Sequence, residues 1–165
     1  MKLFQYAYTH FLKEQSFYAK ALATVLVIFG ARLWLINNYG SSVPYWDQWG
    51  TPLTDLFLPW LNCDLSVEQF FAFSNEHRPF FTRSLDLSLL VVNGQWDPLV
   101  EMVVNSGIYA FAIFIFMVII KNLIGNRVDH SLFLLLIPLG AIPFGWESTL
   151  AGLHTGWYLV LLFTF

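Results

Sequence analysis

Long apolar runs alternate with polar segments along this chain, and their lengths predict membrane-spanning helices. A helix needs about 20 apolar residues to cross the hydrocarbon core of a bilayer. Two runs have that length, at residues 17–38 and 99–120. A shorter run with two prolines covers 131–144, and another apolar run follows at 146–165. The pattern therefore predicts an all-α, polytopic membrane bundle of about four transmembrane helices.

Three segments lie outside these runs. Residues 1–16 and 121–130 are short, whereas residues 39–98 form a loop far longer than an ordinary connection. The long loop is rich in Phe, Leu and Trp, which disordered segments lack. We therefore expect a folded, helical first loop between the first two spans.

Two stretches of this loop carry helix signals. In DLSVEQFFAF, Ser66 and Gln69 have the spacing of a capping box. In NEHRPFFTRSLDLSLLVVNG, Asn75 is a candidate N-cap, Pro79 suits the first turn, and Gly94 is a stop signal.

The second of these helices has an apolar stripe near helical spacing. Arg83 and Asp86 lie off that stripe. Its members are Phe81, Leu85, Leu89 and Val92. Such helices either lie along the membrane surface with the apolar face down or pack only against the protein's other helices.

The basic residues predict the orientation, because Lys and Arg concentrate on the cytoplasmic side of membrane proteins. The first twenty residues carry Lys2, Lys13 and Lys20, and Lys121 and Arg127 follow the second run. The long loop instead holds an excess of acids over arginines and several tryptophans. We therefore expect a cytoplasmic N-terminus and an extracytoplasmic loop, in a bacterial inner (plasma) membrane.

The two ends of the chain carry separate expectations. The first run has a basic approach but no A-x-A-like cleavage site, so we interpret it as a retained anchor rather than a signal peptide. The chain stops at Phe165 inside an apolar run. We therefore expect the sequence to be a fragment of a longer protein.

Composition supports the membrane interpretation and excludes some functions. Charged residues make up 12% of the 165 residues, and the mean hydropathy is +0.59, whereas a soluble domain carries about 25% charged residues. The net charge of -3 and the lack of a basic stripe argue against a nucleic-acid partner. The single cysteine, Cys63, excludes an intramolecular disulfide and a cysteine-based metal cluster.

The first candidate for chemistry is Asp47, which lies between Trp46 and Trp49 soon after the first span. Burial on an aromatic ledge would raise the pKa of this carboxyl toward the range of a general base. The alternative is a solvated turn within an interfacial aromatic belt.

Glu147, in PFGWESTLAG, is the second candidate. By the predicted topology it faces the same side of the membrane as Asp47, so the two carboxylates could meet. Alternatively, Glu147 is only a favourable acid at the N-terminus of the last helix.

Basic candidates lie in the loop and in the first span. Glu76, His77 and Arg78 are consecutive, and Arg78 or Arg83 could hold a phosphate bidentately. The alternative is helix capping with a surface ion pair. Arg32, inside the first span, either extends to the outer headgroups or binds a lipid phosphate.

Glu101 and Asn105 have i, i+4 spacing and share one face of the second span. They either line the interior of the bundle or form hydrogen bonds between helices.

This layout, with YWDQW, NEHRPFFTR and PFGWESTLAG, resembles the N-terminal part of the type-C glycosyltransferases, which use polyprenyl-phosphate sugars. The resemblance covers nearly all of the chain from about residue 17. It implies an inverting sugar transfer on the extracytoplasmic side. It implies that Asp47 and Glu147 are catalytic and that Arg78 and Arg83 hold the donor phosphate. The residue patterns described above add Arg32, Trp46, Trp49, Glu76 and His77 as further candidate substrate-binding residues.

The chain departs from that family in two respects. Asp47 is followed by Gln48, so the acid pair of several branches is absent. Family members also have more spans than the runs found here. Some branches use a divalent cation, Mg or Mn, so the resemblance leaves metal dependence open.

Two other functions compete with sugar transfer. A transporter would place charged groups deep in its spans, whereas the deep positions here are nearly all apolar. A non-catalytic membrane protein whose outer loop binds a partner or lipid explains the aromatic residues as anchors. It leaves the outward acids without a shared role.

Overall fold

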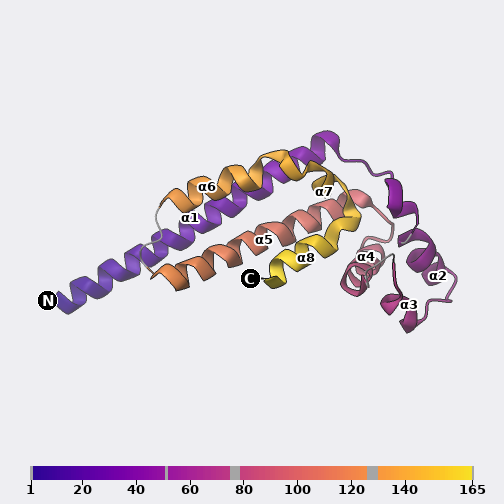
Figure 1. Cartoon of the computed structure of the whole chain (residues 1–165), viewed down its shortest axis with the longest axis horizontal. Coiled ribbons are helices and arrows are strands. Elements are labelled where there is room, and N and C mark those ends of the chain that lie inside the picture. Colours follow the sequence, from indigo (N-terminus) through magenta and orange to yellow (C-terminus); the bar gives the residue numbers. More distant parts are fainter. Residues whose placement is uncertain (1, 51, 75–78, 126–129, 165) are drawn as a thin grey trace.

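The computed structural model describes residues 2–50, 52–74, 79–125 and 130–164. Its regular elements are helices that form an elongated bundle with a cluster of short helices at one end (Figure 1). In chain order they are α1 (Lys2–Tyr39), η1 (Trp46–Trp49), η2 (Leu53–Phe57), α2 (Leu58–Leu61), α3 (Val67–Phe71), α4 (Phe80–Asn93), α5 (Pro98–Ile124), α6 (His130–Ala141), η4 (Pro143–Gly145), α7 (Trp146–Leu150), η5 (Gly152–His154) and α8 (Thr155–Thr164).

Three helical segments are long and apolar enough to cross a membrane. They are Ser16–Tyr39, Pro98–Ile124 and Ser131–Leu150. The first two contain the predicted spans 17–38 and 99–120. The third extends the predicted run 131–144 through η4 into α7, which brings it to 20 residues. The prediction of an all-helical membrane-type protein is confirmed at this level.

Helices α1 and α6 run in the same direction, and α5 runs opposite to them (Figure 1). Helix α5 packs against both α1 and α8, and α6 packs against α1. The short helices of residues 46–93 gather where α1 ends and α5 begins (Figure 1). We call this the loop end of the bundle.

The core far from the loop end is formed by apolar side chains of α1, α5 and α6. Membrane helices pack by close van der Waals contact. The buried members are Phe17, Ala21, Ile28, Ile113, Met117, Phe133 and Leu136.

The predicted fourth span, 146–165, is interrupted within the described residues. Helix α7 ends at Leu150, Ala151 is extended, and α8 begins only at Thr155. The 10 residues of α8 rise about 15 Å, roughly half of the hydrocarbon thickness. A membrane-crossing helix over this segment stays a prediction.

The helix signals of the loop are largely confirmed. The backbone N–H of Ser66 donates to Oε1 of Gln69 at 2.6 Å, which is one half of the predicted capping box of α3. Gly94 ends α4 with a φ of +72°, a left-handed conformation that glycine adopts without strain. Pro79 precedes α4 as its N-cap rather than lying in its first turn, and Asn75 lies outside the described residues.

Helix α4 buries its polar side and exposes the two ends of its apolar stripe. Arg83 and Asp86 are 2% and 3% exposed, whereas Phe81 and Val92 are 61% and 87% exposed. Large exposed apolar side chains are costly in water, but they suit a helix whose outer face contacts lipid. Leu85 and Leu89 are half-buried, and the Phe81 ring lies 6.1 Å from the Phe163 ring of α8, so both predicted arrangements of this helix stay predictions.

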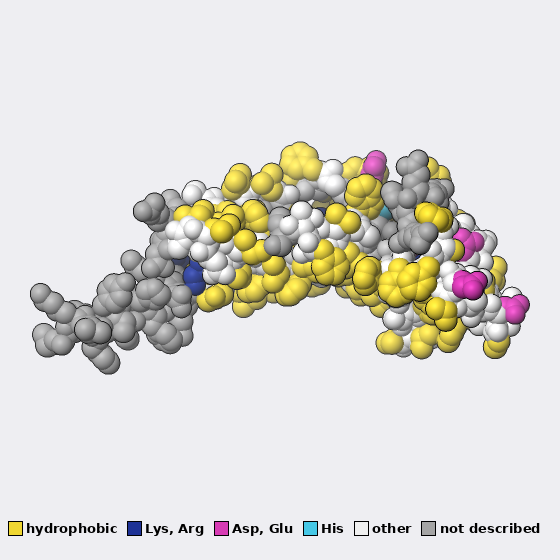
Figure 2. Space-filling model, turned by 60° about the horizontal axis from the view of Figure 1, so that its bottom comes forward, with side chains coloured by type: hydrophobic (Ala, Val, Ile, Leu, Met, Phe, Trp, Pro, Cys, Tyr) yellow, Lys and Arg dark blue, Asp and Glu magenta, His cyan; other side chains and the backbone are white. Residues whose placement is uncertain are grey.

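Charge is distributed unevenly along the bundle. Figure 2 shows hydrophobic side chains along this face and acidic side chains near the loop end. The exposed acids of the described residues are Asp47, Asp55, Asp64, Glu68 and Glu147. Lys121 instead lies in the last turn of α5, at the opposite end.

Candidate functional site

A buried polar network joins the loop to the spans at the loop end. Glu101, in the first turn of α5, accepts hydrogen bonds from Nε1 of Trp96 at 2.7 Å and from Nε2 of Gln48 at 3.0 Å. Gln48 is completely buried, and Glu101 is 3% exposed. Each carboxylate oxygen therefore has a donor, which offsets part of the cost of burying the group.

Asn105 continues this network one turn further along α5. Its Nδ2 donates to the carbonyl oxygen of Gly152 at 2.7 Å, and its Oδ1 accepts from Oγ1 of Thr155 at 2.8 Å. These bonds satisfy backbone and side-chain groups at the break between α7 and α8. Glu101 and Asn105, at i, i+4 spacing, therefore line the bundle interior and also form hydrogen bonds to other elements. The two predicted alternatives for this pair both apply.

Asp47 is exposed, because η1 directs its neighbour Gln48 inward instead. Oε1 of Gln48 accepts from the backbone N–H of Tyr45 at 2.8 Å, which closes the η1 turn. Trp46 and Trp49 are 76% and 50% exposed. The aromatic ledge is therefore present, but it does not bury the carboxylate of Asp47 within the protein.

Glu147 is exposed in the first turn of α7, the position that favours an acid near a helix N-terminus. The η1 turn that carries Asp47 contacts η5, and η5 follows α7 after a single residue. The two segments that hold the predicted catalytic acids are therefore neighbours at the loop end, although a hundred residues separate them in sequence.

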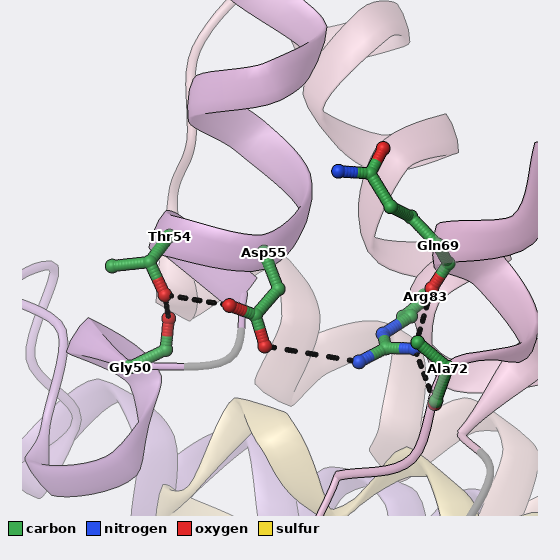
Figure 3. A network of polar contacts seen from close by, with 6 residues as sticks. All are labelled: Gly50, Thr54, Asp55, Gln69, Ala72 and Arg83. Carbon is green, nitrogen blue, oxygen red and sulfur yellow. Dashed lines mark hydrogen bonds and ion pairs between the residues drawn. The ribbon is translucent and has the colours of Figure 1, made fainter. Parts of the chain in front are cut away.

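Arg83 is engaged within the loop rather than exposed to a ligand. Its Nη1 donates to the carbonyl oxygens of Gln69 at 2.6 Å and of Ala72 at 2.7 Å. Its Nη2 lies 3.9 Å from Oδ2 of the half-exposed Asp55. Figure 3 shows Arg83 between η2 and the end of α3, with Thr54 donating to Asp55. Arg83 therefore fastens α4 to α3 and η2.

The remaining predicted substrate-binding residues are Arg32 and residues 76–78. Glu76, His77 and Arg78 lie outside the described residues. Arg32 lies in α1, where its guanidinium carbon is 3.7 Å from the centre of the Tyr109 ring.

A divalent-cation site is not formed by the described part of the chain. No group of three or more His, Cys, Asp or Glu side chains that could hold a metal occurs there. Glu101, the most enclosed acid of the network, already receives an N–H donor on each oxygen.

Three residues important to this geometry were not predicted. Gln48 stands beside Asp47, and this position is the one sequence signal of its role. Asp86 follows Arg83 by three residues, so both lie on one helix face. Gly152 had no sequence signal, because its role depends on the side chains of Glu101 and Gln48 that approach it.

Asp86 predicts a pH dependence of stability. Burial raises the pKa of this carboxyl well above its usual value, and the negative charge of Glu101 adds to the effect. A raised folded-state pKa means that the folded protein holds a proton which the unfolded chain releases. Stability is then fully present below the unfolded pKa of about 3.9 and is lost as pH rises through the folded pKa.

Replacing Asp86 with Asn should remove this loss, because the amide stays neutral. We expect thermal unfolding in detergent to show D86N more stable than the wild type at about pH 8, with the difference shrinking toward about pH 4. A control, D64N, changes an exposed acid and should keep the wild-type pH slope. Parallel slopes for D86N and the wild type would contradict the assignment.

No family model, no curated protein and no solved structure matches this chain.

Proposed function

We propose that this chain is the N-terminal part of a membrane glycosyltransferase that moves a sugar from polyprenyl phosphate to an acceptor hydroxyl. The single observation that carries the proposal is the contact between η1 and η5. It brings the segment of Asp47 next to the segment of Glu147 at one end of the spans. The resemblance of YWDQW, NEHRPFFTR and PFGWESTLAG to the type-C enzymes supports the same function.

The orientation of the bundle is part of this proposal. The exposed acids of the described residues gather at the loop end, and Lys121 lies at the other. By the positive-inside rule, the loop end is extracytoplasmic and the N-terminus is cytoplasmic. A lipid-linked donor reaches the protein from the side, with its head at the interface. The reacting groups should therefore lie at that height, which in this proposal is the height of Asp47 and Glu147.

Asp47 is assigned the role of general base. Its carboxylate takes the proton of the acceptor hydroxyl as the acceptor oxygen attacks the anomeric carbon. The bond from that carbon to the phosphate oxygen breaks on the opposite face, so the configuration inverts and the lipid phosphate leaves as an anion. Glu147 is assigned to the acceptor side, where a second carboxylate can accept a hydrogen bond from the incoming sugar or alcohol.

The buried side chain of Gln48 holds the η1 turn that carries Asp47 in a fixed position. Because Gln48 is buried between Glu101 and the backbone of Tyr45, the preceding Asp47 side chain is left exposed. A catalytic group acts best when its support is rigid. In this proposal Glu101 and Gln48 position Asp47 and do not contact the substrate.

The test measures transfer of a labelled sugar from polyprenyl phosphate. The protein encoded by the complete reading frame is reconstituted in liposomes for this assay. Asp47→Asn should reduce the rate by about 100-fold or more, the contribution typical of a general base. Asp64→Asn, a change at an exposed acid of the same loop, should keep the wild-type rate. Equal rates for D47N and the wild type would refute the role of Asp47. A parallel assay with an added chelator measures metal dependence separately.

A further inference from the structure

A pocket of about 200 Å³ lies between α1 and the connection from α6 to α7. Its volume greatly exceeds the roughly 10–15 Å³ that a single water needs. Arg32 contributes the only ionisable side chain among its lining residues. The other residues include Trp34, Ala141, Ile142, Pro143 and Thr149.

Arg32 carries a charge that the described residues do not neutralise. No carboxylate of the described chain lies within 4.0 Å of its guanidinium. Its Nη1 donates to the Tyr158 hydroxyl at 3.1 Å, and that hydroxyl donates to the carbonyl oxygen of Ser148 at 2.8 Å. The face of the Tyr109 ring adds a cation–π contact.

One N–H group of Arg32 has no hydrogen-bond partner among the described residues. Nε is buried and without a hydrogen bond within the described structure. A buried donor without a partner costs about 1–3 kcal/mol, and an unpaired charge inside a membrane bundle costs more. Tyr109 and Tyr158 fix the guanidinium in place without neutralising it. An anion in the adjacent pocket would supply the missing negative charge.

The surroundings of the pocket indicate where that anion comes from. Trp34 and Ile142 line the pocket and are 61% and 46% exposed, so the pocket reaches the outer surface of the bundle. Both belong to segments long and apolar enough to span a membrane. Tryptophan favours the membrane–water interface. A ligand that enters here arrives from the lipid, at the height of the headgroups.

We propose that this pocket binds the phosphate group of a membrane lipid, with Arg32 as the charged ligand. A guanidinium offers paired N–H donors that match phosphate oxygens. The phosphate lies beside Arg32, and the hydrocarbon chain leaves over Trp34 and Ile142 into the bilayer. The phosphate site deepens the proposed function, because a polyprenyl-phosphate donor would carry such a phosphate group. It rests on the proposed function only for the identity of the lipid.

Binding is measured with the full chain in nanodiscs of neutral phosphatidylcholine, using polyprenyl phosphate without a sugar as the probe. Arg32→Gln should weaken binding by about 10- to 100-fold, the range of a charge-assisted hydrogen bond. Arg32→Lys keeps the charge but not the paired donors, so its loss should be smaller. Ala141→Leu fills the pocket without changing charge and should also weaken binding.

Lys121→Gln is the matched control. Lys121 is another cation of a candidate span, 4.5 Å from the Tyr18 ring centre, and does not line the pocket. This variant should bind the probe like the wild type. Thermal unfolding of each variant checks that lost binding is not lost folding.

Competitors identify the group that is recognised. Polyprenol, which lacks the phosphate, and inorganic phosphate, which lacks the lipid, should both compete poorly. Undiminished binding by folded R32Q, or equal competition by polyprenol, would overturn the phosphate site. Equal competition by inorganic phosphate would overturn the lipid assignment. Because no sugar is present, these outcomes are separate from the loss of transfer that tests Asp47.

Discussion

Replacing Arg83 with methionine is expected to lower the free energy of unfolding by about 2–4 kcal/mol, one of the two largest effects that the structure predicts. Methionine keeps a long apolar stem but removes the donors. The carbonyl oxygens of Gln69 and Ala72 would then lose the guanidinium bonds of 2.6 and 2.7 Å. Because these contacts fasten α4 to the end of α3, the loop end should loosen first.

Reversible unfolding in mixed micelles, followed by circular dichroism, measures this change. The matched control is Asp55→Asn, at the half-exposed acid 3.9 Å from Nη2 of Arg83. A solvent-screened pair at that distance contributes about 0–1 kcal/mol, so D55N should be nearly as stable as the wild type. An equal loss in both variants would show that the ion pair, and not the backbone bonds, holds the loop.

Replacing Gly152 with alanine is expected to destabilise the protein by about 1–3 kcal/mol through overpacking. The new Cβ would overlap Oε2 of Glu101 and would lie 2.8 Å from Cβ of Glu101 and 2.9 Å from Nε2 of Gln48. The contacts belong to the buried network, so neither side chain can move away without losing hydrogen bonds. The hydrogen bond from Gln48 to Glu101 should therefore lengthen or break.

Gly107→Ala is the control, because a Cβ at that helical position meets nothing within 4 Å. It should be neutral or slightly stabilising, since alanine favours a helix by up to about 1 kcal/mol relative to glycine. Sugar transfer gives a second measurement, because a displaced Gln48 would also displace Asp47. If G152A matches G107A in stability, the packing described at the η1–η5 contact is wrong.

The helical part of the fold was largely predictable from local signals. Spans 17–38 and 99–120 follow from the length of their apolar runs, and both lie inside the candidate spans of the structure. Gly94 ends α4 because glycine adopts positive φ without strain. Such features depend on a few neighbouring residues, so they can be predicted from a linear sequence.

The contacts of the candidate site were less predictable. Asp47 was evident from its tryptophan neighbours, but its exposure depends on Gln48 turning inward toward Glu101. Arg83 was legible as a basic residue, yet its partners are the carbonyl oxygens of a different helix. A residue type indicates which bonds a side chain can make, whereas only packing decides which partners are available.

The sequence by itself determined that this chain is helical and suited to a membrane, because burying backbone polar groups in lipid requires long apolar helices. It also determined which residues carry charge. Only the tertiary structure decided that the loop folds back onto one end of the spans, so that η1 meets η5 and Arg32 is left beside a pocket with an unpaired N–H. The physical reason is that contacts between distant segments depend on shape and hydrogen-bond partners in three dimensions, which no local pattern of residues records.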